Sequence, residues 1–248
     1  MDLIFCAGGN KRFADIAIEA GFFYGSQLPE TVYHAPYLVD QDWKEPNRVA
    51  YMDALKFWMP PVATVLDWEV TQARPCADAN FKETMCWAEE ASQYAGAIII
   101  IPKVVGVVHR IPRMVGGKPI ILGYSIDTGY GGTKCDLSEF AGRDIHLLGG
   151  SPQEQMRIWR ELHLPGMRLL PFDDSPRVVS VDGNMAQKQA IRRNRVWQAE
   201  TPKWVSPHRH WPSLQELDGE KWGKDAPYEA FRRSCKNIMD EWRRLTGC

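Results

Sequence analysis

The sequence predicts an α/β fold and, within that class, a single compact (β/α)8 TIM-like barrel. Eight short apolar segments are bounded by turn residues, and helical patterns fall between most of them. The length of 248 residues is usual for one barrel domain. Apolar segments without polar alternation indicate strands buried on both faces, which is typical of a parallel sheet. A doubly wound open sheet is the alternative.

The predicted strands and helices follow one another along most of the chain. The strands are Leu3–Cys6, Phe22–Gly25, Tyr37–Val39, Ala63–Leu66, Ala97–Ile101, Ile120–Tyr124, Ile145–Leu148 and Val178–Val181. The helices are Arg12–Ala20, Asn47–Trp58, Asn80–Tyr94, Pro152–Leu162, Asn184–Arg195 and Tyr228–Leu245. Ser151 before Pro152 is typical of a helix start, with a serine N-cap and a proline at the first helical position. Strand–helix alternation predicts right-handed crossovers between parallel strands.

Charge and tryptophan are concentrated near the C-terminus. Residues 184–248 hold 13 Lys and Arg against 8 Asp and Glu, although the net charge of the whole chain is −1. We therefore expect a barrel over 1–197 and a basic, Trp-rich extension over 198–248 that packs on it. Such an asymmetry favours an acidic catalytic body and a tail that meets a polyanion. A solvated helical surface is the alternative.

Several classes of protein and site are not indicated. The six cysteines are scattered, without the spacing of a metal site, and His208–His210 has no companion ligand, so we expect free thiols, no metal and no cofactor. The sequence has no GxGxxG, P-loop or GxSxG motif. The longest apolar run, Ala95–Pro102, is too short to span a bilayer, and the N-terminus lacks signal-peptide features. We expect a cytoplasmic protein without a membrane partner.

Three carboxylates come directly after predicted strands. Asp40 follows PYLV, Asp67 follows ATVL, and Asp182 follows RVVSV. In a barrel the carboxyl ends of the strands form one mouth, where catalytic residues project. Carboxylates that converge there raise one another's pKa, which suits acid–base or nucleophilic chemistry. The alternative for each is a structural role; Asp182, for example, could cap the following helix.

An ordered series of segments between Tyr37 and Ala190 resembles the tRNA-guanine transglycosylase superfamily. The segments are TVLDWEVTQARP, FKETMCWAEEASQ, AIIIIPKVVG, ILGYSIDTG, IHLLGGSPQEQM and SVDGNMAQKQA. The most similar members are expected to be phage enzymes that insert 7-deazaguanine bases into DNA. The CxCx₂C…H zinc module of the tRNA enzymes has no counterpart here, so the resemblance implies a barrel without the zinc subdomain.

The resemblance implies roles for individual residues. Asp182 matches the nucleophile, Asp67 matches the residue that reads the guanine edge, and Asp40 matches the general acid–base. Asp42 is an alternative acid–base, because the family's SGG after this position is replaced by Gln41-Asp42-Trp43. Further base contacts are implied at Lys103 near a family glutamine, at the backbone of Thr128 and Gly129, and at the pocket floor of Leu148 and Gly149. Separately, Trp43 is placed to stack on the flipped base, and a core or rim aromatic is the alternative.

The implied activity is guanine exchange in nucleic acid, with DNA and a free 7-deazaguanine base as substrates. If the protein is phage-encoded, it acts in the host cytoplasm. Basic residues expected to track phosphates are Arg110, Arg113, Lys118, Arg192, Arg193 and Arg195. A tRNA-directed enzyme, a plain N-glycosidase and a catalytically silent barrel that binds a base or nucleic acid are the alternatives.

Overall fold

The computed structural model describes residues 1–6, 10–28, 31–42, 44–127, 132–164, 175–199 and 211–247. The strands are β1 (Asp2–Cys6), β2 (Phe23–Gln27), β3 (Leu38–Asp40), β4 (Val62–Thr64), β5 (Ala97–Ile100), β6 (Met114–Val115), β7 (Lys118–Ser125), β8 (Asp144–Leu148) and β9 (Arg177–Asp182). The α-helices are α1 (Lys11–Glu19), α2 (Arg48–Trp58), α3 (Ala77–Ala91), α4 (Pro152–His163), α5 (Met185–Arg193), α6 (Leu214–Asp218) and α7 (Ala226–Thr246).

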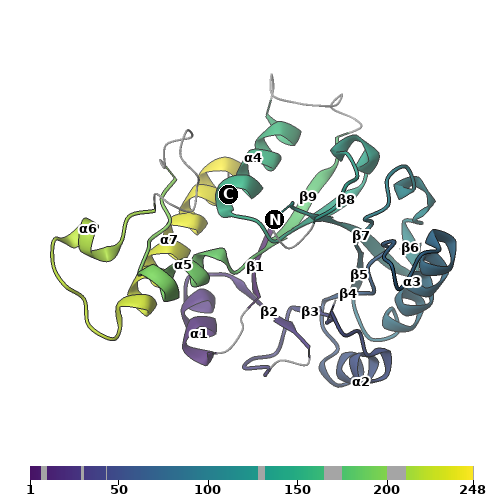
Figure 1. Cartoon of the computed structure of the whole chain (residues 1–248), viewed down its shortest axis with the longest axis horizontal. Helices are drawn as coiled ribbons and strands as arrows, with labels where there is room; N and C mark the ends of the chain where they lie inside the picture. Colours follow the sequence, from purple (N-terminus) through teal and green to yellow (C-terminus); the bar gives the residue numbers. More distant parts are fainter. Residues whose placement is uncertain are drawn as a thin grey trace.

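Eight parallel strands form a closed barrel. Hydrogen-bonded neighbours run in the order β5-β4-β3-β2-β1-β9-β8-β7, and β5 also pairs with β7, which joins the two ends. All eight predicted strands are therefore confirmed, and the open sheet is excluded. The short strand β6, which the sequence analysis missed, pairs antiparallel with β7 as an outer hairpin. Figure 1 shows the strands in the centre with helices around them.

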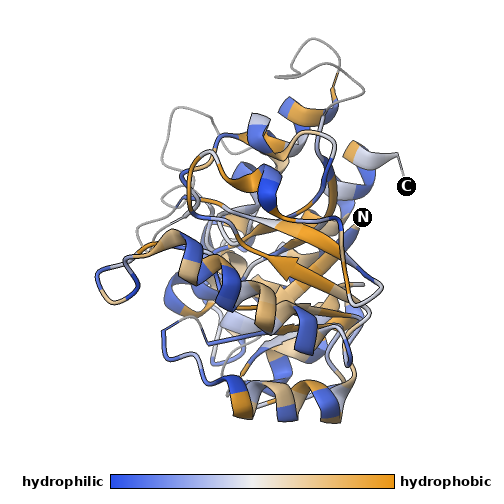
Figure 2. Cartoon of the chain, turned by 90° about the vertical axis from the view of Figure 1, so that its right-hand side faces the viewer, coloured by the Kyte–Doolittle hydropathy of each residue, from blue (hydrophilic) through white to orange (hydrophobic). Residues whose placement is uncertain are grey.

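The barrel strands separate two apolar cores. Inward-facing side chains form a small inner core, whose buried members are Ile4, Leu38, Val62, Ile99 and Ile101. Alternate residues of the same strands, such as Leu3 and Phe5 of β1, face outward into a larger core beneath the helices. In Figure 2 the strands are largely orange, whereas the helices carry many blue residues. Every barrel strand is thus covered on both faces, as the unalternating apolar segments predicted.

The helical layer is incomplete between some strands. Helices α1, α2, α3, α4 and α5 follow β1, β3, β4, β8 and β9. Among the described residues, 3-10 turns at Val108–Arg110 and Leu137–Phe140 take the place of α-helices after β5 and β7. The predicted start of α4 is confirmed, because the Ser151 side chain accepts a hydrogen bond from the Glu154 N–H, with Pro152 in the first turn.

Helix α7 packs against the barrel beside α1 and α5 (Figure 1). Its Phe231 lies 4.9 Å from the ring of Phe5 in β1 and 5.2 Å from Phe13 in α1, and its Trp242 packs edge-on against Trp159 of α4. This helix therefore covers β1 as part of the outer core. Among the described residues, no helix combines the length and apolar character needed to cross a membrane.

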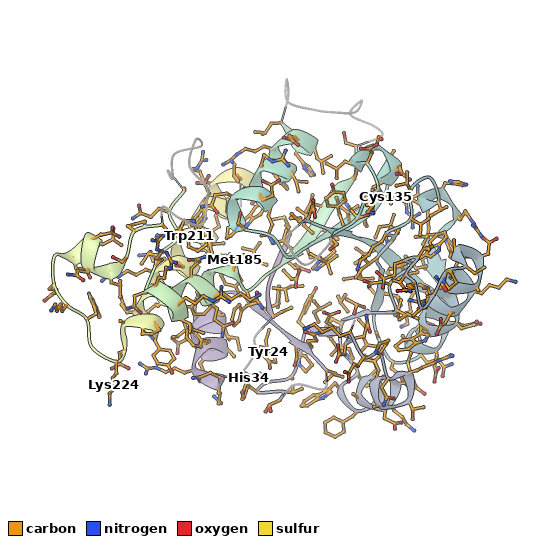
Figure 3. All side chains as sticks on the ribbon, in the orientation of Figure 1. Tyr24, His34, Cys135, Met185, Trp211 and Lys224 are labelled. Carbon is orange, nitrogen blue, oxygen red and sulfur yellow. The ribbon has the colours of Figure 1, made fainter. Side chains whose placement is uncertain are left out.

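The tryptophans near the C-terminus are mostly structural where the structure describes them. Trp197 and Trp211 are fully buried, and Trp211 lies on the α7 side of the molecule (Figure 3). The Trp197 backbone is held by α7, since its N–H donates to Ser234 Oγ and its carbonyl accepts from Asn237. Trp222 is partly exposed, and Trp204 lies outside the described residues. Buried indole rings cannot stack on nucleic-acid bases.

Gly123 of β7 provides a test of the packing inside the barrel. A Cβ atom there would lie 2.5 Å from Ile101 Cγ1 and 2.7 Å from Leu148 Cδ1. Gly123→Ala is therefore expected to lower the free energy of unfolding by about 1–3 kcal/mol, because overpacking forces side chains out of their rotamers. Urea unfolding measures this change. Gly223→Ala is the control, because a Cβ there meets nothing within 4 Å; equal losses at both positions would contradict the packing argument.

Candidate functional site

Three aspartates meet at the carboxyl end of the barrel. Asp40 ends β3, Asp182 ends β9, and Asp67 lies three residues beyond β4. Because the strands are parallel, these positions belong to one mouth. The charges of both Asp182 and Asp67 act on Asp40 and raise its pKa, which places the three carboxylates within electrostatic reach of one another.

A β-bulge turns Asp182 toward the barrel interior. Ile145 of β8 pairs with Val178 of β9, but the next pair is His146 with Ser180, so Val179 is an extra residue. Val178 and Val181 can therefore both face the helices, although they are three residues apart. Asp182 pairs with Leu148 and lies beside Ile4, both of which line the inner core. Bulges of this kind commonly re-aim a side chain next to an active site.

Several groups favour the ionised form of Asp182. Although burial raises the pKa of Asp182, the nearby His146 ring outweighs it, together with hydrogen bonds from the Cys6 thiol and the Gly149 N–H, so the pKa is lowered. Gly149 N lies 3.0 Å and His146 Nε2 lies 3.4 Å from Asp182 Oδ1. Gly149 adopts a φ of +67°, a conformation that glycine accepts at low cost.

Asp182 is not a helix cap. The N-cap residue of α5 is Asn184, and the Asp182 carboxylate is engaged by the loop after β8. The amide of Gln155 in α4 donates to the carbonyls of both Gly149 and Asp182, so it joins the loops after β8 and β9. The site therefore holds the Asp182 backbone and side chain by separate contacts.

His146 and Cys6 are site residues that the sequence analysis missed. His146 is fully buried, and its Nδ1 lies 2.7 Å from Ser180 Oγ, so the ring is fixed with Nε2 toward Asp182. A polar residue inside the apolar segment IHLL was the available signal for His146. Cys6 lies at the end of β1, and the sequence analysis treated it only as one of six scattered cysteines, because no local sequence pattern connects it to Asp182.

The pKa of Asp40 is shifted in the opposite direction to that of Asp182. Burial, followed by the charges of Asp182 and Asp67, raises the pKa of Asp40 to about 7, although a hydrogen bond from Thr64 opposes the rise. Thr64 Oγ1 accepts from the Gln41 N–H and donates to Asp40 Oδ1 at 2.5 Å. Since Oδ1 is an acceptor in this bond, the other oxygen, Oδ2, is the one that can carry a proton.

The neighbouring carboxylate of Asp42 has a local role. Its Oδ1 accepts hydrogen bonds from the backbone N–H groups of Lys44 and Glu45, which is an Asx-type turn. Asp40, by contrast, ends β3 on the same face as the inward-pointing Leu38. Of the two alternatives for the acid–base, the geometry favours Asp40.

Asp67 forms a buried ion pair. Lys103 Nζ lies 2.6 Å from Asp67 Oδ2 and 3.4 Å from Glu69 Oε2. Burial raises the pKa of Asp67 and the Lys103 ammonium opposes the rise, while the two carboxylates raise the pKa of Lys103 against its own burial. Backbone bonds fix the two segments, because Trp68 N donates to the Ile101 carbonyl and Lys103 N to the Trp68 carbonyl.

The other predicted base contacts are only partly described. Leu148 packs against the inner core, and Gly149 donates to Asp182, so both lie at the mouth. Trp43, Thr128 and Gly129 lie outside the described residues.

The basic residues expected to track phosphates do not gather at the mouth. Arg113 and Lys118 lie at the start of β7, which is the opposite end of the barrel. Arg192 and Arg193 lie in the last turn of α5, which runs away from the mouth. Arg195 follows that helix and forms an isolated antiparallel β-bridge with Ser213.

Arg110 differs from these residues, because it lies in the 3-10 turn after β5, at the mouth end of the barrel, but it already forms an ion pair. It pairs with Asp78 in the first turn of α3 and lies over the ring of Phe81. The part of the chain that the structure describes contains no cluster of three His, Cys, Asp or Glu residues arranged to hold a metal ion.

Comparison with known proteins places the chain in a family but does not assign an activity. A family model described as "Family of unknown function (DUF6610)" matches residues 17–243, and the chain belongs to this family. No curated protein matches the sequence.

The raised pKa of Asp40 predicts a pH-dependent effect on stability. An acid whose pKa is higher in the folded state contributes stability below its unfolded pKa, near about 4, and this contribution is lost as the pH rises through about 7. Asp40→Asn should therefore stabilise the protein by about 1–3 kcal/mol more at about pH 8 than at about pH 5. The asparagine oxygen can still accept from Thr64.

Urea unfolding of both proteins at the two pH values measures this difference. Asp42→Asn removes a charge from the same segment but not from the interior. It therefore separates the effect of the buried Asp40 carboxyl on stability from the effect of net charge. A stabilisation by Asp40→Asn that is equal at both pH values would show that Asp40 does not titrate in this range.

Proposed function

We propose that this chain is a pentosyltransferase, a guanine transglycosylase that exchanges guanine in DNA for a 7-deazaguanine base through a covalent intermediate on Asp182. The observation that carries the proposal is the contrast between two carboxyls in one mouth. The pKa of Asp182 is lowered, mainly by His146 against the effect of burial, whereas burial raises the pKa of Asp40 to about 7. Environments that separate two pKa values in this way divide the roles of nucleophile and acid–base.

In the first half of the reaction, an oxygen of Asp182 forms a bond to C1′ of the deoxyribose. The C1′–N9 bond breaks, its electron pair leaves with the purine, and Asp40 gives the departing guanine a proton. A nucleophile must be ionised, and the hydrogen bonds from Gly149 and Cys6 favour that state of Asp182.

In the second half, the incoming 7-deazaguanine gives its N9 proton to Asp40. Its N9 bonds to C1′, and the bond between C1′ and Asp182 breaks, which restores both carboxyl groups. A pKa of about 7 suits a group that is first an acid and then a base near neutral pH. Two displacements on the same carbon retain the sugar configuration, as in retaining glycosidases.

The base must leave the DNA stack before it reaches Asp67. Flipping a nucleotide costs a few kcal/mol, which stacking in the pocket offsets in part. Trp43 and Leu148 are the proposed contacts for the faces of the base, and Asp67 and Lys103 are proposed to meet its edge. Among the described cysteines none forms a disulfide, which is in keeping with a cytoplasmic enzyme.

DNA is the proposed polymer because residues 198–248 do not carry the zinc-ligand spacing of the tRNA enzymes. In this segment α7 instead packs against α1 and α5. A tRNA substrate is the second candidate, and it is included as an arm of the experiment below.

The decisive assay follows radiolabelled guanine in DNA and in tRNA, with and without free 7-deazaguanine. We expect the label to leave DNA only when the deazaguanine base is present. Label that leaves only tRNA would make tRNA the substrate, and release from DNA without an added base would indicate a glycosidase. No release from either polymer would contradict the proposal.

Asp182→Asn tests the covalent step. We expect base exchange to fall by at least about 1000-fold, because the amide is not a nucleophile. The fold should persist, since the amide oxygen can still accept from Gly149. Wild type should form a DNA adduct that survives denaturation when turnover is stalled, and the variant should not. Asp53→Asn on the exposed face of α2 is the control. Near wild-type exchange by Asp182→Asn would refute the mechanism.

A further inference from the structure

The ion pair between Asp67 and Lys103 leaves one carboxylate oxygen without a partner. Lys103 Nζ lies 2.6 Å from Asp67 Oδ2 and 3.4 Å from Glu69 Oε2. Asp67 is only 6% exposed, yet its Oδ1 has no hydrogen-bond partner among the described residues. A buried, unsatisfied carboxylate oxygen is costly, and at the mouth of a barrel it indicates a ligand that donates a hydrogen bond.

The pair therefore offers an acceptor and a donor side by side. Oδ1 of Asp67 can accept one hydrogen bond, and the Lys103 ammonium, with three donors, retains one beyond its two carboxylate partners. The complement of this pattern is a lactam, in which a ring N–H lies next to a carbonyl. Guanine presents that pattern at N1–H and O6, as do hypoxanthine and their 7-deaza forms.

We propose that Asp67 and Lys103 together recognise the lactam edge of a purine, N1–H and O6, with little dependence on the 2-amino group. This inference rests on the proposed function, because it assigns the base site of that reaction. The sequence analysis implied a glutamine-like contact at Lys103; the structure has a cation there that occupies one of the two oxygens of Asp67.

The occupied oxygen determines which purines are accepted. Because Lys103 lies on the Oδ2 side of the carboxylate, a purine whose N1–H bonds to Oδ1 and whose O6 meets Lys103 turns its 2-amino group away from Asp67. Adenine presents an acceptor at N1 and a donor at N6. Its N1 would face the acceptor oxygen of Asp67, and its N6 amino group would face the donor ammonium of Lys103. A site built on polar contacts rejects such a mismatch strongly, because its buried groups remain unpaired.

Lys103 also has an electrostatic role in this assignment. As the C1′–N9 bond breaks, negative charge spreads over the purine and reaches O6. An ammonium already held beside O6 stabilises that charge without reorganisation. A neutral side chain at this position would provide a weaker hydrogen bond.

The first test compares base release, with free 7-deazaguanine present, from DNA that contains deoxyguanosine, deoxyinosine or deoxyadenosine at one position. We expect wild-type kcat/KM for hypoxanthine release to be within about threefold of that for guanine, and adenine release to be at least about 1000-fold slower. Rejection of hypoxanthine by more than about 100-fold would overturn the proposal.

Variants of Lys103 provide the second test. Lys103→Met should reduce guanine exchange by at least about 100-fold, because it removes the donor to O6 and its charge. It should also raise the preference for guanine over hypoxanthine by at least about tenfold, since Asp67 Oδ2 becomes free to accept from the 2-amino group. Lys134→Met, an exposed lysine on the loop after β7, is the matched control.

Lys103→Gln keeps a neutral donor beside Asp67 and is the variant to use if Lys103→Met fails to fold. It should lose at least about tenfold in guanine exchange, because a charge-assisted hydrogen bond is replaced by a neutral one. Unchanged exchange and selectivity in both variants would overturn the role of Lys103.

A binding measurement separates this inference from the proposed function. Calorimetry with 7-deazaguanine, 7-deazahypoxanthine and 7-deazaadenine should give similar Kd values for the first two and no binding of the third. Such a result without any base exchange would support the lactam site and reject the transglycosylase. Guanine exchange with rejection of 7-deazahypoxanthine would support the transglycosylase and reject the lactam site, and no binding of any base would reject both.

Discussion

Hydrogen bonds between β5 and β7 close the barrel, and the position of every mouth residue depends on that closure. These two strands are separated by an excursion that runs outside the barrel through a 3-10 turn and the β6 hairpin. The buried guanidinium of Arg143 braces the excursion, since it donates to the carbonyls of Ile111 and Pro112. Closure brings strands from both halves of the chain to one mouth, so that Asp182 from β9 acts on Asp40 from β3.

Within that mouth, three identical side chains differ because their partners differ. Asp182 receives a hydrogen bond from a loop N–H and faces a buried histidine, Asp40 has a threonine hydroxyl, and Asp67 has an ammonium. The β-bulge in β9 is essential to the first of these, because in regular alternation Asp182 would follow Val178 onto the outer face. Fixed donors favour the charged state of one carboxyl, and burial favours the neutral state of another.

The strand positions and the three strand-end aspartates could be predicted from the sequence because they are local features. Unalternating apolar runs identify buried parallel strands, and the first polar residue after each run lies at the mouth. The bulge, the approach of His146 and Cys6 to Asp182, and the pairing of Lys103 with Asp67 depend on contacts between different strands, which no local pattern encodes. The positions of the basic residues depend on the fold in the same way: sequence shows the charge of Arg192 and Arg193, whereas the direction of α5 places them away from the mouth.

The base site and the acid–base are electrostatically linked. The charge of Asp67 contributes to the raised pKa of Asp40, and Lys103 lies 2.6 Å from that same carboxylate. A purine that donates its N1–H to Asp67 Oδ1 adds positive potential on the far side of the carboxylate, which reduces the repulsion felt by Asp40. An occupied base site would then favour release of the proton from Asp40 more than an empty one. In the proposed reaction, the bound guanine thus assists the proton transfer that its own departure requires.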